Sequence, residues 1–362
     1  MGKIVFIGGM ERSGINLIRK ILNSHPDVAA GPQTEIVDEI SRLYSAMAVS
    51  ISDGHLGAYL TTPQMRSGIS RLIEAIYSPY ADKKAKTIVV DCSPRNLWSF
   101  PLLAELLPEA KFLHIIRDGR DVACSFRDVG TRASERGVQL ERVAAVASGS
   151  IARCSAIWAE TVRFGWDHCG PDSLLARSGR AFTTFYENVV LSPESQIRNI
   201  CEFLGIEFTQ TMLHPERLYH DSMPDGIYTL EHDQNAPISM LSAGRWIDHL
   251  SLKDRIVFYA QGHVGLRLAG YDDSVQWLFR GLTIPVSSGL DALQQARSEL
   301  LGDQTTRREP TGKIEAPQSS SKLALQKSVV NAPGSSISGI ILPEIEAIIR
   351  VASQSGAPFL QG

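Results

Sequence analysis

The chain has 362 residues, of which 43% are hydrophobic and 21% charged, and its formal net charge is −3. This balance is typical of a water-soluble protein with a sizeable core, and no apolar run approaches the roughly 20 residues of a membrane span. The charge excludes a globally basic surface for nucleic acid, so an anion site must come from a local cluster of cations. Five scattered cysteines without a C-x-x-C pair indicate neither a zinc site nor a disulfide framework. Because no signal peptide is recognised, we expect a cytoplasmic protein.

Short apolar runs alternate with helical patterns along the first 280 residues. The predicted strands are Lys3–Ile7, Thr87–Asp91, Lys111–Ile116 and Phe182–Tyr186. The predicted helices cover residues 15–24, 139–167 as one long helix, 193–204 and 253–268. Continuous apolar runs are typical of strands covered on both faces, as in parallel sheets. The alternation therefore predicts an α/β fold of three layers, with a central parallel sheet flanked by helices.

The composition changes near the C-terminus, which suggests further segments. We expect residues 1–280 to form one domain and residues 281–302 a connecting helix or loop. Residues 303–339 are rich in Ser, Thr, Pro and Gln and predict a flexible linker. Residues 340–362 form a short apolar segment, whose first part has the pattern of an amphipathic helix.

The strongest chemical signal is the turn from Gly9 to Asn16, between the first strand and the first helix. Its two glycines at P-loop spacing let backbone N–H groups point at a phosphate, next to the positive end of the helix. The Lys-Ser/Thr pair of a P-loop is replaced by Ile15-Asn16, which argues against hydrolysis of ATP or GTP. Arg12 could supply the missing charge. By itself, such a turn is also common without any ligand.

A second basic turn follows the strand that ends at Ile116. Arg117 begins this turn and Ser125 lies about two helical turns further on. Because ligands of open α/β sheets bind at the carboxyl ends of the strands, we expect Arg117 to face the same crevice as Arg12. Two strand ends with arginines suit a ligand with two separated phosphates. Taken alone, the Arg117-Asp118 pair favours a surface ion pair.

Together these segments resemble the sulfotransferases that use 3′-phosphoadenosine 5′-phosphosulfate (PAPS), and the tyrosylprotein-type branch in particular. The resemblance covers roughly residues 3 to 275. The matching motifs are Arg12-Ser13-Gly14-Ile15-Asn16, His25-Pro26, the 112–120 segment with Ser125, Tyr186-Glu187, Phe203-Leu204-Gly205-Ile206 and Arg245-Trp246.

The resemblance implies a sulfotransferase fold, PAPS as the sulfate donor and no metal requirement. The donor-binding residues would be Arg12, Ser13, Gly14, Ile15, Asn16, Arg117, Ser125, Tyr186 and Arg245. The loop would hold the 5′-phosphosulfate, and Arg117 with Ser125 would hold the 3′-phosphate. Tyr186 would lie near the nucleotide and Arg245 near its phosphates. The reaction would be an in-line sulfuryl transfer, with positioning and electrostatics supplying most of the catalysis.

The sequence departs from the branch at positions that carry chemistry. Gln33 stands where the branch has its glutamate base, and an amide cannot take a proton at neutral pH. Cys92 replaces a lysine, and Ile15 replaces a threonine. Glu35 could act as the base, Ser93 could donate to the sulfuryl group, and Arg12 could stabilise the charge. Glu35 is equally interpreted as a solvated residue in the first turn of a helix.

Three functions therefore stay open. The first is an active sulfotransferase with a hydroxyl-bearing acceptor, such as protein tyrosine, a glycan or a small molecule. The second is a catalytically silent nucleotide-binding protein with the same fold. The third is a P-loop kinase, against which Ile15-Asn16 argues. The class of acceptor and a homodimer are left open as well.

Overall fold

The computed structural model describes residues 3–140, 142–218, 236–282 and 286–305, together with 343, 345–347, 349 and 350. These residues fall into two compact units. The first unit comprises Met1–Arg117 and Phe164–Ala243, and the second comprises Asp118–Arg163 and Gly244–Gly362. The predicted division of the chain at residues 280, 302 and 339 stays a prediction.

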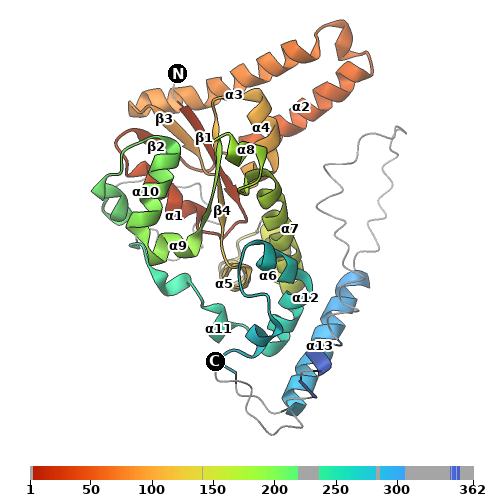
Figure 1. The fold of residues 1–362 in the computed structure, drawn as a ribbon. Helices are drawn as coiled ribbons and strands as arrows, with labels where there is room; N and C mark the ends of the chain where they lie inside the picture. The colour runs from red at the N-terminus through yellow and green to blue at the C-terminus, as the bar shows by residue number, and fades with distance from the viewer. Residues whose placement is uncertain are drawn as a thin grey trace. The chain divides into compact units, whose positions relative to one another are not determined.

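The first unit is built on a five-stranded parallel sheet (Figure 1). Its strands are β1 (Lys3–Gly9), β2 (Val28–Ala30), β3 (Ile88–Asp91), β4 (Lys111–Ile116) and β5 (Ala181–Phe185). They are arranged in the order β2-β3-β1-β4-β5. The central strand β1 therefore pairs with β3 on one side and with β4 on the other, which places the carboxyl ends of these three strands next to one another. The predicted parallel α/β sheet is confirmed.

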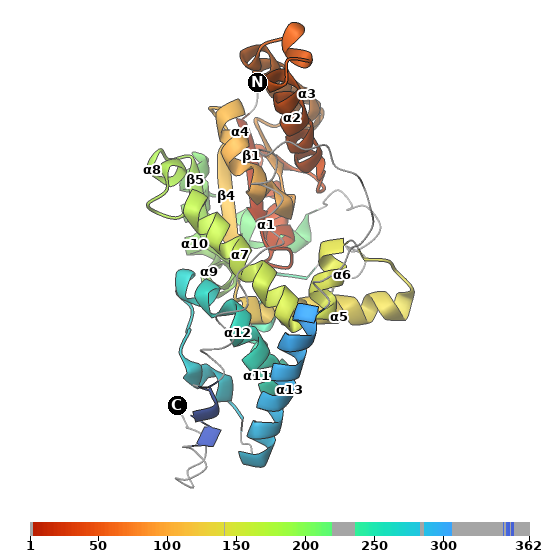
Figure 2. The same ribbon diagram turned by 90° about the vertical axis from the view of Figure 1, so that its right-hand side faces the viewer.

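Helices cover both faces of this sheet (Figures 1 and 2). One face is covered by α1 (Ile15–Asn23), α9 (Tyr186–Leu191) and α10 (Pro193–Leu204). The other is covered by α2 (Ile36–Ser52), α3 (Thr62–Lys84), α4 (Phe100–Leu106) and the end of α7 (Ile151–Cys169). Side chains alternate between the faces along β1: Val5 and Ile7 pack under α1, whereas Ile4 and Phe6 pack under α3 and α4. The continuous apolar runs thus mark strands buried on both sides, as predicted.

Helices α2 and α3 form a hairpin that the sequence analysis left unassigned. The two helices lie side by side, and the turn that connects them lies away from the sheet (Figure 1). Thr61 begins α3 with a capping box, in which its side chain accepts from the N–H of Gln64 and the Gln64 side chain accepts from the N–H of Thr61. This hairpin closes the α4 face of the sheet.

The second unit is helical. It contains α5 (Gly119–Arg136), α6 (Arg142–Gly149), the first part of α7, α11 (Trp246–His249), α12 (Leu252–Leu268) and α13 (Val286–Thr305). The prediction of one long helix over residues 139–167 is wrong, because α6 ends at Gly149 and α7 begins after Ser150. Ser150 accepts hydrogen bonds through its side chain from the N–H of Arg153 and through its carbonyl from that of Cys154, so it caps a new helix.

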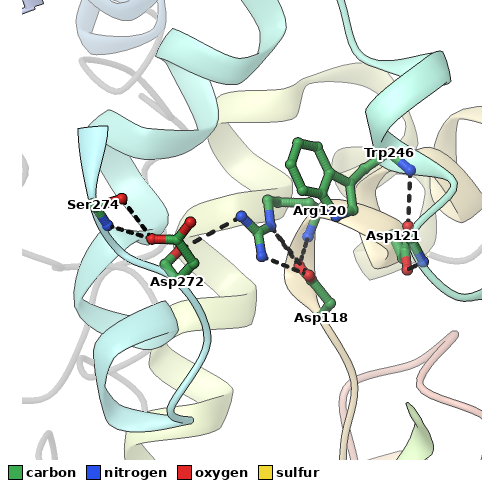
Figure 3. Close-up of polar contacts among 7 residues, drawn as sticks. Asp118, Arg120, Asp121, Trp246, Asp272 and Ser274 are labelled. Carbon is green, nitrogen blue, oxygen red and sulfur yellow. Dashed lines mark hydrogen bonds and ion pairs between the residues drawn. The ribbon is translucent and has the colours of Figure 1, made fainter. Parts of the chain in front are cut away.

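A buried arginine ties the start of α5 to the segment before α12 (Figure 3). Arg120 is only 4% exposed and forms a forked ion pair with Asp118, at 2.8–3.1 Å. Its guanidinium also lies 4.2 Å from the ring centre of Trp246 and 4.7 Å from that of Trp277. Asp121 accepts from the N–H of Trp246 at 2.9 Å, which adds a backbone tie at the same place. Asp118, Arg120 and Asp121 of this segment therefore stabilise the packing of the second unit.

The C-terminal segment contacts α13. The described residues between 343 and 350 are helical, and Ile345 and Ile349 are fully buried. Glu346 pairs with Arg297 of α13 at 2.9 Å. Helix α13 occupies the predicted connecting segment and continues to Thr305, whereas the rest of the predicted linker lies outside the described residues. No helix in the described part of the chain is long and apolar enough to cross a membrane.

His114 makes the stability of the first unit depend on pH. It is buried in β4, and burial lowers its pKa to about 3. The folded pKa is below the ordinary value of about 6.5, so the stability held by the neutral ring is present above pH 6.5 and is lost as the pH falls. We expect a loss of up to about 1.4 kcal/mol per pH unit below 6.5, measured by denaturant unfolding. The variant His114→Asn should show a shallower pH dependence, whereas exchange of the exposed His55 to Asn should not. Equal slopes for both variants would contradict this account.

Candidate donor site and neighbouring acidic cluster

The loop between β1 and α1 has the backbone of an anion-binding turn. Arg12 has φ 69° and Gly14 has φ 92°, so the chain turns into the left-handed region twice within three residues. Such turns direct successive N–H groups into one concave surface. A Cβ atom on Gly9 would lie 2.3 Å from the carbonyl oxygen of Ile115, and one on Gly14 would lie 2.4 Å from the Tyr186 ring. Both glycines are therefore required by close neighbours and not only by the turn.

The N-terminus of α1 opens onto this loop without a side-chain cap. The hydroxyl of Ser13 is buried, since the residue is 1% exposed, and it has no hydrogen-bond partner in the described part of the chain. The first N–H groups of this nine-residue helix have no acceptor within the helix, so its N-terminus attracts a negatively charged group. The loop, the helix end and the buried hydroxyl together suit a phosphate or sulfate.

Arg117 contacts this loop from the end of β4. Its Nη1 donates to the carbonyl of Arg12 at 2.9 Å, and its Nη2 donates to that of Ser242 at 2.5 Å. The guanidinium stacks 4.4 Å from the ring centre of Tyr186, and that ring packs against Gly14. The structure thus brings Arg12, Arg117 and Tyr186 together around one loop. The role of Arg117 at a 3′-phosphate stays a prediction, because both of its Nη atoms donate here to protein carbonyls.

The remaining predicted donor residues lie in the second unit. Ser125 is a largely buried residue of α5. Arg245 precedes α11, and its Nη2 donates to the carboxylate of Asp128. Within that unit Arg245 is therefore held by an acidic partner, and contacts of either residue with the nucleotide stay predictions.

A second cluster surrounds Asp91, at the end of β3. Asp91 is 1% exposed, and one of its carboxylate oxygens accepts from the N–H and the hydroxyl of Ser93, at 2.8 and 2.6 Å, and from Asn96 at 3.1 Å. The other oxygen accepts from the hydroxyls of Thr34, at 2.5 Å, and Tyr77. Burial and the Asp91 charge both raise the pKa of Tyr77, which keeps this phenol a donor. No sequence motif pointed to Tyr77, which lies on α3.

This cluster holds the segment that carries Gln33 and Glu35. The Ser93 oxygen accepts from the N–H groups of Thr34, at 3.1 Å, and Glu35, at 3.0 Å, while its proton goes to Asp91. The predicted donation from Ser93 to a sulfuryl group would therefore need a change of this network. Glu35 precedes α2 with φ 53°, a left-handed conformation that costs roughly 1–2 kcal/mol in a residue with a side chain. Gln33 and Glu35 are both half-buried.

Cys92 is a core residue. It is fully buried among the apolar side chains under α1. Burial and the charge of Asp91 raise the pKa of its thiol, so the side chain is neutral at physiological pH. Cys92 therefore serves as a packing residue, and it leaves the position without a cation of its own. Among the described residues, no group of His, Cys, Asp and Glu could hold a metal ion.

Comparison with known proteins identifies the family. Residues 5–210 match the sequence model of the sulfotransferase family. The chain belongs to this family. The match includes the β1–α1 loop, the Asp91 cluster, Arg117 and Tyr186, so the site described above lies in the part that defines the family.

Several relatives are protein-tyrosine sulfotransferases. Protein-tyrosine sulfotransferase A of Caenorhabditis elegans is 28% identical over 271 residues, which is 74% of this chain and 67% of that protein. Protein-tyrosine sulfotransferase 2 of Gallus gallus is 26% identical over 278 residues, with 74% and 69% covered. The match to the protein-tyrosine sulfotransferase of Drosophila melanogaster, 26% identical, covers 68% of this chain and 47% of that protein. A solved sulfotransferase domain from the curacin biosynthetic pathway is 18% identical, with a TM-score of 0.47, and covers 75% of this chain and 98% of that domain.

The Asp91 cluster of this sulfotransferase can be tested through stability. The variant Tyr77→Phe removes one donor from a buried carboxylate, and we expect it to lower the free energy of unfolding by about 1–3 kcal/mol. The matched exchange Tyr59→Phe, at a tyrosine that is 86% exposed, should change it by less than about 0.5 kcal/mol. Denaturant unfolding measures both. If the two variants were equally stable, the hydroxyl of Tyr77 would not support Asp91.

Proposed function

We propose that this chain transfers a sulfuryl group from PAPS to a hydroxyl-bearing acceptor, and that protein tyrosine is the acceptor. The observation that carries the donor is the contact of Arg117 and Tyr186 with the loop of Arg12 and Gly14. A doubly phosphorylated nucleotide needs two anion sites next to each other, and an aromatic ring beside them suits a nucleotide. The acceptor class is that of the similar proteins, which are protein-tyrosine sulfotransferases.

The residues of the site divide the reaction between them. The acceptor oxygen attacks the sulfur, the bond from sulfur to the 5′-phosphate oxygen breaks, and adenosine 3′,5′-bisphosphate leaves. Ser13, the N–H groups at the start of α1 and Arg12 stabilise the charge that develops on the leaving phosphate. Glu35 takes the proton of the acceptor hydroxyl. Gln33 cannot accept this proton, and Glu35 is the carboxylate two residues further along the same segment, which Ser93 holds in place.

One observation favours a different function. Cys92 is a neutral core thiol and the proton of Ser93 is used within the protein, so neither of these two residues after β3 offers a cation or a donor to a ligand in this conformation. A chain that binds the nucleotide without transferring sulfate is therefore the second candidate. A cytoplasmic location and a homodimer stay predictions from the sequence.

Donor binding is tested with the bisphosphate product. We expect adenosine 3′,5′-bisphosphate to raise the melting temperature, whereas ATP with Mg²⁺ should have little effect because the loop lacks the P-loop lysine. The variant Arg12→Ala should abolish the shift. Exchange of Arg198, an exposed residue of α10 paired with Glu194, to Ala should leave it unchanged. A preference for ATP with Mg²⁺ would favour a kinase, and full retention of the shift in Arg12→Ala would mean that another loop binds the donor.

Catalysis is tested by transfer of labelled sulfate from PAPS to tyrosine peptides, with glycans and small phenols in parallel. We expect transfer to tyrosine by the wild-type chain, and a fall of about 10²- to 10⁴-fold in kcat for Glu35→Gln, since general-base help is of that size. Bisphosphate affinity should be retained in this variant. A double variant, Gln33→Glu with Cys92→Lys, is tested beside the wild-type chain. If both bind the product but transfer no sulfate, the silent nucleotide-binding function replaces the enzymatic one.

A further inference from the structure

A third arginine, besides Arg12 and Arg117, contacts the donor loop region. Arg19, on the second turn of α1, is 2% exposed, which makes it one of the largest fully buried side chains of the protein. Its Nε donates to Oδ1 of Asn16 at 2.9 Å. Its Nη1 is buried and has no hydrogen-bond partner in the described residues, and within them no salt bridge to a carboxylate involves Arg19. A buried cation without an anionic partner is unfavourable, so this arrangement calls for an anion.

The guanidinium of Arg19 points toward the N-terminus of α1, which is the side of the carboxyl ends of β1 and β3. Side chains on a helix lean toward its N-terminus, and the bond to Asn16 shows that Arg19 does so. Its positive charge also acts on the thiol of Cys92, which follows β3. Arg19 is thus bonded to the first turn of α1 and lies within electrostatic reach of Cys92.

The bond to Asn16 also orients an amide in the first turn of α1. Because Oδ1 of Asn16 accepts from Arg19, the NH₂ group of the same side-chain amide points away from Arg19 and acts as a donor. Ser13 adds a buried hydroxyl next to the same helix end. Arg19 and Ser13 therefore each present a buried donor atom that has no hydrogen-bond partner among the described residues, and the Asn16 amide lies beside Arg19, which is the chemistry of an anion site.

We propose that Arg19 is a further anion-binding and positioning residue of the donor site. It holds the Asn16 amide with its donor toward the 5′-phosphosulfate, and it supplies positive charge from α1 at the side of the site where Cys92 stands. This inference rests on the proposed function, because it concerns the same donor.

The test measures the affinity for adenosine 3′,5′-bisphosphate by titration calorimetry, in variants that change the charge at positions 19 and 92. We expect Arg19→Met to weaken binding by roughly 10- to 100-fold, as for the loss of a buried charge-assisted hydrogen bond. Adding Cys92→Lys to this variant returns a cation from β3 and should recover at least part of the loss. In the wild-type background Cys92→Lys should lower the melting temperature instead, because it places two cations together.

The control is an arginine whose side chain has a structural role. Arg180, before β5, donates to the carbonyls of Ala104, Leu107 and Ala110. The variant Arg180→Met should lower the melting temperature and leave the affinity for the bisphosphate within about twofold. If Arg19→Met behaves in the same way, Arg19 is structural and the inference is overturned.

Three other outcomes are decisive. A loss of affinity in Arg19→Met that Cys92→Lys does not rescue overturns the role of charge. If Arg19→Met does not fold, Arg19→Gln decides, since it removes the charge while keeping a polar side chain; affinity should still fall several-fold, and unchanged affinity overturns the inference. If the wild-type chain binds no bisphosphate, the proposed function itself fails and this inference fails with it.

Discussion

The hydrogen bond from Arg117 to the carbonyl of Arg12 joins the ends of two adjacent strands, and the candidate site depends on it. It is available only because β1 pairs directly with β4, so that the residues following the two strands meet at one edge of the sheet. Tyr186 completes the arrangement by packing between Gly14 and the Arg117 guanidinium. The shape of the loop is therefore set by a contact across the sheet, in addition to its own glycines.

On the other side of β1, a buried carboxylate organises the edge of the sheet. Asp91 collects donors from α3, from the segment before α2 and from the turn after β3, and so holds Glu35 in a strained conformation. Strained residues that the surroundings fix in this way are common at functional sites. The anionic cluster at β3 and the cationic loop at β1 are adjacent, which separates proton acceptance from charge stabilisation in the proposed reaction.

The Arg-Asp-Gly-Arg segment shows how neighbours in sequence divide their roles. Arg117 belongs to the donor loop, whereas Asp118, Arg120 and Asp121 support the helical second unit through Trp246 and its flanking backbone (Figure 3). Part of this motif therefore supports packing within the second unit.

The sequence by itself determined features whose causes are local. The strand β4 and the helix from Pro193 to Gly205 were predicted to the residue or nearly so, because apolar runs, N-terminal proline and C-terminal glycine act within a few residues. The same holds for the glycine-bounded loop. Tertiary structure decided the break at Ser150, the bond between Tyr77 and Asp91, and the burial of Arg19. These features depend on which side chains meet across the sheet or pack between elements, and the spacing of residues along one segment does not encode such contacts.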